Sequence, residues 1–234
     1  KMFTQSQLQE IKNLLLPENK VVIITHYNPD GDAIGSSLGL KHFLKTLGLE
    51  PIVIVPNDFP KFLKWMPEAK KTIIADYKRK MASDAIKDAD VIFCLDFNAH
   101  NRIGIVGDWL ANATAKKILI DHHQQPEDFD FVYSDVTIPA TCQMIYHFIE
   151  ALGKEDLVNQ NIAECLYTGI MTDTGGFRFR STSATTHRIV ANLIEKGADP
   201  AMITSNTWDT NTVSRLHLLS LILGRIELVK DGKV

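Results

Sequence analysis

The residues best suited to chemistry lie in four separate stretches that are rich in aspartate and histidine. The first stretch begins at His26, reads HYNPDGDAIGS, and also contains Asp30 and Asp32. A proline and a glycine between these residues favour a turn, in which the two carboxylates can converge. The alternative is an Asx-rich turn that only caps the following helix, with Asp32 as the cap. Capping explains one aspartate but neither the histidine nor the second carboxylate.

The second and third stretches each follow a short apolar run. Asp96 closes the run VIFCL, and Asp121, His122 and His123 close the run KILI. A single carboxylate in this position can simply begin a loop. Two adjacent histidines behind an aspartate seldom arise from packing, and the carboxylate can fix the tautomer of a metal-bound ring.

The fourth stretch is TGIMTDTGGFRFR, in which Asp173 ends a helical segment. Its two glycines allow a close approach of the backbone to a ligand. Arg178 and Arg180 are placed to grip a phosphate group in a bidentate manner. The alternative interpretation is a glycine helix cap followed by surface arginines.

Taken together, these stretches offer four or five carboxylates, two or three histidines and no cysteine. Oxygen and imidazole ligands suit Mn²⁺ or Mg²⁺, with Zn²⁺ and Co²⁺ as alternatives. Carboxylates gathered in one place repel one another unless cations neutralise them. Two divalent ions would do so, and a two-metal site clamps both the attacking and the departing oxygen of an in-line displacement. The residues therefore indicate phosphoester hydrolysis.

Buried strands that alternate with helices must position these stretches. Short β-branched runs without polar alternation are typical of parallel strands buried on both faces. The pattern predicts a doubly wound α/β fold, with a mainly parallel sheet and helices on both of its faces. Ligands in such sheets bind at the carboxyl ends of the strands, where three of the four stretches lie. Strands are expected at 21–25, 52–55, 73–74, 91–95, 117–120 and 226–229, and helices at 5–16, 33–47, 81–89, 141–152, 159–172, 185–196, 202–207 and 213–223, with a loop or short helix at 109–115.

The composition limits the partners of the protein. Hydrophobic residues make up 45% of the chain and charged residues 23%, which allows a sizeable core. A net charge of −3 offers no basic field for long duplex nucleic acid, although bound metals would still allow a small phosphorylated substrate. No apolar run has the length of a membrane span or a signal peptide. The three cysteines are widely spaced, which indicates buried reduced thiols and a cytoplasmic location.

The order and spacing of the four motifs resemble those of the DHH phosphoesterase superfamily over residues 20 to 180. The Asn28-Pro29 pair and the segment TDTGGFRF resemble the bacterial nano-RNase branch, which degrades short oligoribonucleotides and dephosphorylates 3′-phosphoadenosine 5′-phosphate. The resemblance implies two Mn²⁺ ions and a water that they activate. One ion would be held by His26 and Asp30, the other by Asp32, His122 and Asp173, and Asp96 would bridge the two.

The same resemblance implies roles for further residues. His123, Asp96 and Asp32 would be catalytic, with His123 beside the scissile phosphate. Arg102 and Arg178 would join His123 in binding the substrate. Asp121 and Asn28 would support the ligands from behind, Asp121 by orienting a histidine.

The resemblance also implies a division of the chain. Residues 1–197 would form the catalytic domain, and residues 198–234 a linker helix and the start of a truncated C-terminal substrate-binding domain. Cyclic dinucleotides, pyrophosphate and polyphosphate are alternative substrates for the same fold. A non-enzymatic nucleotide-binding module is disfavoured because every motif position is filled. A homodimer is compatible with the sequence.

Overall fold

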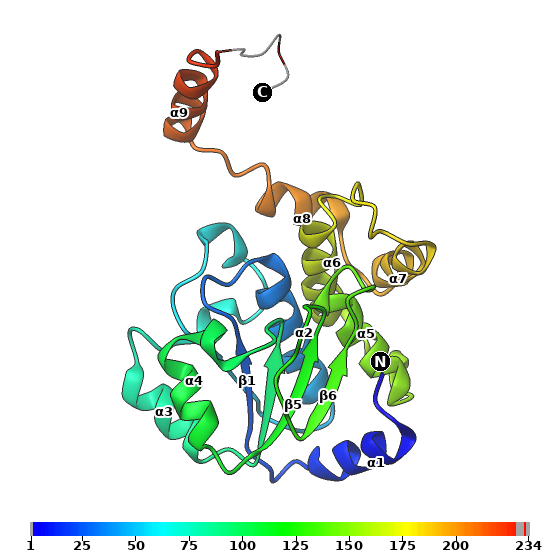
Figure 1. The fold of residues 1–234 in the computed structure, drawn as a ribbon. Helices are drawn as coiled ribbons and strands as arrows, with labels where there is room; N and C mark the ends of the chain where they lie inside the picture. The colour runs from blue at the N-terminus through cyan, green and yellow to red at the C-terminus, as the bar shows by residue number, and fades with distance from the viewer. Residues whose placement is uncertain (1, 228–231, 233–234) are drawn as a thin grey trace.

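A parallel β-sheet forms the centre of the molecule (Figure 1). The computed structural model describes residues 2–227 and residue 232. The sheet has six strands in the order β3-β2-β1-β4-β5-β6, and all neighbouring strands are parallel. The strands are β1 (Val21–Thr25), β2 (Ile52–Val55), β3 (Ile73–Ile74), β4 (Val91–Leu95), β5 (Lys116–Asp121) and β6 (Phe131–Ser134).

Helices cover both faces of this sheet, which confirms the predicted fold class. One face packs against α2 and α5, with α6 packed on these two helices, and the other face packs against α3 and α4. The α-helices are α1 (Gln5–Leu14), α2 (Gly31–Thr46), α3 (Arg79–Lys87), α4 (Ile105–Asn112), α5 (Thr141–Ala151), α6 (Gln160–Asp173), α7 (Ala184–Glu195), α8 (Pro200–Thr207) and α9 (Val213–Leu223). Short 3-10 helices are η1 (Lys61–Leu63), η2 (Ala69–Lys71), η3 (His100–Ile103) and η4 (Glu155–Leu157).

The central strands are apolar throughout because both of their faces are buried. In β1 and β4, Ile23 and Phe93 pack in the core beneath α2 and α5, whereas Ile24 and Cys94 pack beneath α3 and α4. Successive side chains of a strand point to opposite faces, so a strand covered on both sides requires a continuous apolar run. The runs VVIIT and VIFCL meet this requirement.

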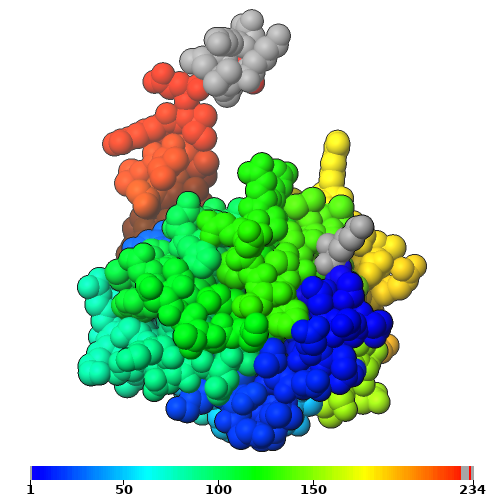
Figure 2. Space-filling model, turned by 60° about the horizontal axis from the view of Figure 1, so that its bottom comes forward, coloured from blue at the N-terminus to red at the C-terminus, as the bar shows by residue number. Residues whose placement is uncertain are grey.

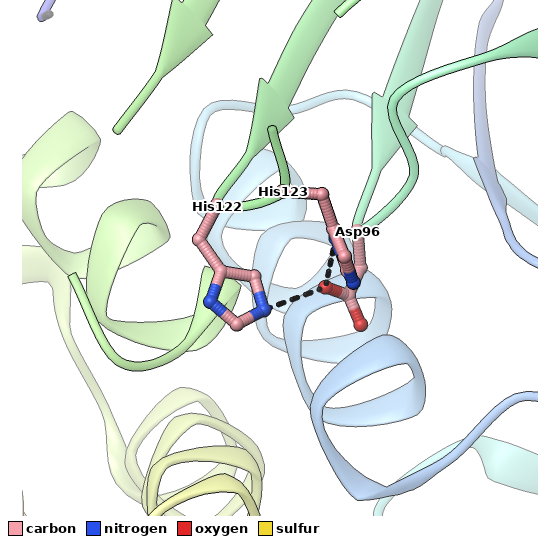
Figure 3. Close-up of side chains that lie close together, drawn as sticks. All are labelled: Asp96, His122 and His123. Atoms are coloured by element: carbon pink, nitrogen blue, oxygen red, sulfur yellow. Dashed lines mark ion pairs between the residues drawn. The ribbon is translucent and has the colours of Figure 1, made fainter. Parts of the chain in front are cut away.

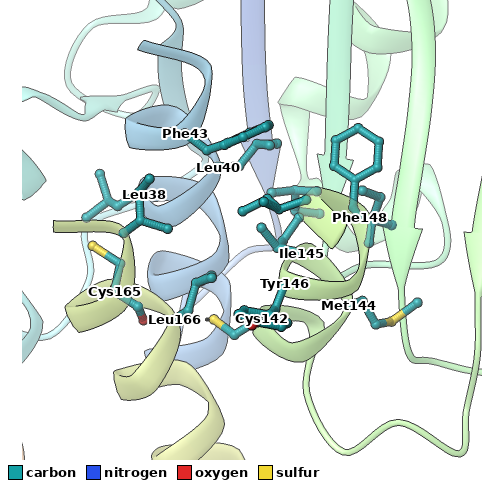
Figure 4. Packing of buried hydrophobic residues seen from close by; sticks show 14 of the residues in the cluster. Leu38, Leu40, Phe43, Cys142, Met144, Ile145, Tyr146, Phe148, Cys165 and Leu166 are labelled. Carbon is teal, nitrogen blue, oxygen red and sulfur yellow. Dashed lines mark hydrogen bonds between the residues drawn. The ribbon is translucent and has the colours of Figure 1, made fainter. Parts of the chain in front are cut away.

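Glycines bring α2 and α6 into close contact. A Cβ on Gly35 would lie 2.6 Å from the carbonyl oxygen of Cys165, and one on Gly39 would lie 2.6 Å from a methyl carbon of Leu166. Figure 4 shows side chains of α2, α5 and α6 meeting in this layer. At the other end of the contact, Gly31 abuts the side chain of Thr172. The start of α2 therefore lies beside the end of α6.

The three cysteines are buried free thiols, as predicted. Burial raises the pKa of each thiol, which keeps it protonated. The cysteines therefore act as small apolar residues of the core.

Two elements differ from the sequence prediction. Helix α4 begins at Ile105 and ends at Asn112, earlier than the loop or short helix expected at 109–115. It follows Gly104, whose φ of 56° turns the chain, and it buries Val106 and Leu110 against the sheet. Strand β6 was not predicted, because only Phe131 and Tyr133 of its four residues are buried. So short an edge strand carries little pattern of its own.

The C-terminal segment leaves the body of the molecule after α8. Helix α8 packs against α6 and η1 and buries Ile203 and Thr207. Helix α9 has no buried residue and stands clear of the body in two different views (Figures 1 and 2). In the strand expected at 226–229, Ile226 and Glu227 are not in a strand, and residues 228–229 lie outside the described part. The division of the chain at residue 197 stays a prediction.

No helix among residues 2–227 combines the length and the apolar character that crossing a bilayer requires.

A cluster of ion pairs fastens the β2–β3 connection to α2. Glu68 lies 3.0 Å from Lys41 Nζ, 3.0 Å from Lys45 Nζ and 2.7 Å from Lys71 Nζ, and its side chain is 17% exposed. Burial favours the neutral acid, but the hydrogen bonds from the three lysines outweigh it and hold the pKa of Glu68 far below its usual value. A lowered pKa means that the carboxylate stabilises the fold above about pH 4, and that this stabilisation is lost as the pH falls further.

We therefore expect Glu68→Gln to lower the free energy of unfolding at pH 7 by about 1.5–3 kcal/mol, the range for hydrogen bonds to charged groups. Urea denaturation at several pH values measures the effect, and the difference from the wild type should shrink below about pH 4. The exposed Glu18→Gln is the matched control. An equal difference at pH 7 and pH 3 would contradict the role given to the ion pairs.

Candidate metal centre

The predicted ligand residues gather at one edge of the sheet. His26 follows β1, Asp96 follows β4, and the Asp121-His122-His123 triplet closes β5. These three strands are neighbours in the sheet, so their carboxyl ends meet. The order of the strands also reverses between β1 and β4, which opens a crevice there in sheets of this kind.

Asp96 lies at the centre of the cluster. Its Oδ2 is 3.5 Å from His26 Nε2, its Oδ1 is 3.4 Å from His122 Nε2, and it is only 2% exposed. Figure 3 shows His122 and His123 directed toward this carboxylate. The backbone φ of 64° at Asp96 is unusual for a residue other than glycine and is tolerated where the surroundings enforce it. Each carboxylate oxygen therefore faces a different histidine.

One potential ligand set consists of His26, Asp30 and Asp96, with ligand atoms within 4.8 Å of one another. The Nδ1 of His26 lies 2.8 Å from the carbonyl oxygen of Tyr27. A carbonyl only accepts hydrogen bonds, so Nδ1 carries the proton and Nε2 keeps its lone pair for a metal.

A second potential set consists of Asp32, His122 and Asp173. The Nε2 of His122 is 3.5 Å from Asp173 Oδ2 and 3.9 Å from Asp32 Oδ2. Its Nδ1 lies 3.2 Å from the carbonyl oxygen of Ile138, which fixes the same tautomer as in His26. The contact between α2 and α6 brings Asp32 and Asp173 together.

The two aspartates of the first motif have different structural roles. Asp30 caps α2, because its Oδ1 accepts hydrogen bonds of 3.0 Å from the backbone N–H groups of Asp32 and Ala33. The alternative that Asp32 is the cap is therefore wrong. Asp32 is 1% exposed and instead accepts hydrogen bonds of 2.5 and 2.8 Å from the first N–H groups of α5, those of Thr141 and Cys142.

The charges of the cluster favour a bound cation. Burial, followed by the nearby charges of Asp96 and Asp173, raises the pKa of Asp32 well above its usual value. Burial and the charge of Asp96 likewise raise the pKa of Asp173 to about 6. Burial lowers the pKa of His26 and His122, but hydrogen bonds to Asp96 outweigh it and raise them to about 9 and 10. Bound protons thus offset the negative charge of the crowded carboxylates, and a divalent ion would offset it more fully. The carboxylate and imidazole donors also fit such an ion.

His123 forms a third potential set with Asp96 and His122, and a buried carboxylate orients its ring. Its Nδ1 lies 2.7 Å from Asp121 Oδ1, and its backbone N–H donates to the other oxygen of Asp121 at 3.1 Å. The His123 side chain is 37% exposed, whereas Asp121 is fully buried. Asp121 therefore orients His123, and Nε2 of His123 is free of this bond.

Asn28 and Arg102 support the first motif through different atoms. The backbone N–H of Asn28 donates to Asn57 Oδ1 at 2.7 Å, and Asn28 Oδ1 accepts from Asn57 Nδ2 at 2.8 Å. The carbonyl of Arg102 accepts a hydrogen bond of 2.8 Å from the N–H of Tyr27. Both contacts hold the loop that carries His26 and Asp30.

Within residues 2–227, no contact joins the side chain of Arg102 or Arg178 to the carboxylates. Arg178 is exposed, and its Nε donates to the carbonyl of Gly175 at 2.6 Å. Two contributors escaped the sequence analysis. The hydroxyl of Thr141 donates to Asp96 Oδ1 at 2.9 Å, and Asn57 pairs with Asn28. The position of Thr141 at a predicted helix start was the available signal, and Asn57 offered none.

Comparison with known proteins agrees with this arrangement. The model of the DHH family, N-terminal domain, matches residues 20–170, a stretch that contains all the potential metal ligands except Asp173. The chain belongs to the DHH family. It is 35% identical over 189 residues to the bifunctional oligoribonuclease and PAP phosphatase NrnA of Thermus thermophilus, a match that covers 80% of this chain and 53% of that protein. The chain thus spans about half the length of that relative.

Two further matches broaden the comparison. The crystal structure of an exopolyphosphatase-related protein from Bacteroides fragilis superposes with a TM-score of 0.95 at 40% identity, covering 99% of this chain and 68% of that one. The cyclic-di-AMP phosphodiesterase PdeA of Listeria monocytogenes is 24% identical over 96% of this chain and 35% of that protein. The fold is therefore shared by proteins whose names specify different phosphate compounds.

We expect Mn²⁺ to stabilise the protein against thermal unfolding through this cluster. A free ion concentration of 100 times Kd adds about 2.7 kcal/mol to the stability of a folded state with one site. Asp96→Asn should remove most of this gain, because Asp96 faces both ligand sets, and a chelator should reverse the gain in the wild type. The control is Asp84→Asn, which alters an exposed carboxylate paired with Lys80. Unchanged unfolding with Mn²⁺, Mg²⁺, Co²⁺ and Zn²⁺ would contradict a metal centre here.

Proposed function

We propose that this DHH-family chain is the catalytic part of a metal-dependent phosphoesterase that hydrolyses short oligoribonucleotides from the 3′ end and dephosphorylates 3′-phosphoadenosine 5′-phosphate. The observation that carries the proposal is the position of Asp96, whose two oxygens each face one potential ligand set. A carboxylate between two ligand sets is what a two-metal phosphoesterase requires. The similarity to the NrnA of Thermus thermophilus supports the choice of substrate.

The ligand sets define which residues would hold the metal ions. His26 and Asp30 would hold one, Asp32, His122 and Asp173 the other, and Asp96 would contact both. Mn²⁺ is the expected metal, with Mg²⁺, Co²⁺ and Zn²⁺ as alternatives, because all donors are carboxylate oxygens or imidazole nitrogens. Two such ions supply an activated water and neutralise charge on the phosphate.

His123 would act on the substrate rather than on a metal. Its Nδ1 is engaged by Asp121, which leaves Nε2 to exchange a proton with an oxygen of the phosphate or of the leaving group. The buried carboxylate of Asp121 holds the ring in one orientation. The pair thus resembles a general acid with its orienting group.

The charge of the chain supports a short substrate. A net charge of −3 provides no field that would hold a long duplex. The roles of Arg102 and Arg178 in binding substrate, a homodimer and a C-terminal substrate-binding domain stay predictions. Cyclic dinucleotides form the second candidate class, which the similarity to PdeA favours.

We expect a protein that contains this chain to release mononucleotides from a di- or triribonucleotide in the presence of Mn²⁺. Asp96→Asn should reduce the rate by about 100-fold or more, since even residues behind metal ligands contribute about 10–100-fold. Chromatography of the products measures the release, and Asp84→Asn is again the control. Pyrophosphate, polyphosphate and cyclic-di-AMP belong in the same panel. Hydrolysis of one of these, with ribonucleotides left intact, would reject the substrate assigned here.

His123→Ala and Asp121→Asn should separate catalysis from metal binding. Loss of a positioned proton donor typically costs about 10²–10⁴-fold in rate, so we expect kcat to fall in His123→Ala. Asp121→Asn should have a smaller effect of about 10–100-fold, because the ring remains but loses its orienting charge. The thermal shift caused by Mn²⁺ should persist in both variants. A variant that loses the thermal shift together with kcat would instead mark its residue as part of the metal centre.

A further inference from the structure

A cavity of about 710 Å³ opens next to the ligand cluster. Asp30 and Thr172 line it, together with Phe62, Thr207, Trp208 and Arg215 among others. Asp30 belongs to one of the potential ligand sets, and Thr172 directly precedes Asp173 of the other. The cavity therefore lies directly beside the ligand cluster, where the proposed function places the phosphate of the substrate.

Trp208 gives the cavity an aromatic surface. The indole of Trp208 is 40% exposed although it sits at the end of a helix packed on the body. One edge of the indole rests on Gly176, where a Cβ would lie 3.0 Å from two ring carbons. Gly176 belongs to the loop that follows Asp173, so the indole ring packs against a loop that begins at a potential metal ligand. Exposed aromatic rings on a firm backing are the surfaces on which nucleobases stack.

The lining of the cavity also includes polar groups. Arg215 has no carboxylate within ion-pair distance among the described residues, whereas Asp58 in the same cavity is already paired with Lys64 at 2.7 Å. Thr207 is 3% exposed, and within the described part of the chain its hydroxyl has no hydrogen-bond partner. The cavity thus combines an aromatic face with an unpaired cation.

We propose that this cavity binds the base and ribose of a single nucleotide whose phosphate lies at the ligand cluster, with Trp208 as the stacking surface for the base. The inference rests on the proposed function only for the position of the phosphate. The volume of the cavity lies within the range of about 300–1,000 Å³ that is typical of small-molecule sites. A cavity of this size suits one nucleoside rather than a long strand. Stacking tolerates every base, so the cavity selects nucleotides over other phosphates without selecting a sequence.

Binding of adenosine 5′-monophosphate, measured by calorimetry with Mn²⁺ present, tests this proposal. Ribose 5-phosphate and inorganic phosphate are the comparison probes. Trp208→Ala should weaken binding of the nucleotide by about 5- to 150-fold, the effect of losing one base–aromatic stack, and leave the two comparison probes unchanged. Trp208→Phe keeps an aromatic face and should retain most of the affinity. Unchanged binding of the two comparison probes by Trp208→Ala shows that its loss of nucleotide affinity does not come from unfolding.

Matched controls locate the effect in this cavity. Tyr77→Ala removes an aromatic ring that is 69% exposed elsewhere on the surface and should leave nucleotide binding unchanged. Arg215→Gln should weaken nucleotide binding more than Arg225→Gln, which removes a charge just beyond the end of the same helix. Equal affinity of the wild type for the nucleotide and for ribose 5-phosphate would overturn the proposal. So would a Trp208→Ala variant that weakens all three probes alike.

The test is separate from that of the proposed function. Nucleotide binding that depends on Trp208, in a protein that hydrolyses no oligoribonucleotide, would reject the proposed reaction and keep the cavity. Normal hydrolysis, with nucleotide binding that does not change in Trp208→Ala, would keep the proposed reaction and reject the role of the cavity.

Discussion

The structure depends on holding several carboxylates together at the edge of a sheet. Asp32 and Asp96 are almost completely buried, and like charges in such surroundings oppose ionisation. The protein offsets this cost with its own groups. His26 and His122 face the two oxygens of Asp96, and the first N–H groups of α5 face Asp32. The positive end of α5 and the protonated rings of His26 and His122 thus hold the carboxylates in place. A bound divalent metal would supply the positive charge that the ring protons otherwise carry.

This charge cluster imposes its demands on the packing behind it. Asp173 reaches His122 only because α6 lies close against α2, and that approach requires residues without side chains at the contact. Gly35 and Gly39 meet α6 where any larger residue would collide. Packing in the apolar layer shown in Figure 4 therefore sets the positions of the potential metal ligands. A change in the helix contact would move one ligand relative to the others.

The ligand cluster and the cavity beside it differ in how firmly the surrounding structure supports them. The ligand residues are supported by strand ends, helix ends and hydrogen bonds to backbone atoms, which suits chemistry that depends on position. The cavity beside Asp30 is bordered by the ends of α8 and α9, and α9 has no buried residue of its own. In the binding mode proposed for this cavity, the contacts to the base and ribose come from the ends of α8 and α9.

The sequence by itself determined the class of fold and the identity of the clustered side chains. Continuous apolar runs such as VIFCL predicted strands buried on both faces, and polar residues directly after them marked the ligand edge. Tertiary structure decided what depends on partners distant in the chain. Asp30 rather than Asp32 caps α2, because α5 claims the carboxylate of Asp32 through N–H groups more than a hundred residues away. Strand β6, the support from Thr141 and the cavity at Trp208 were equally hidden, since a sequence pattern records local periodicity and carries no record of which distant surfaces will meet.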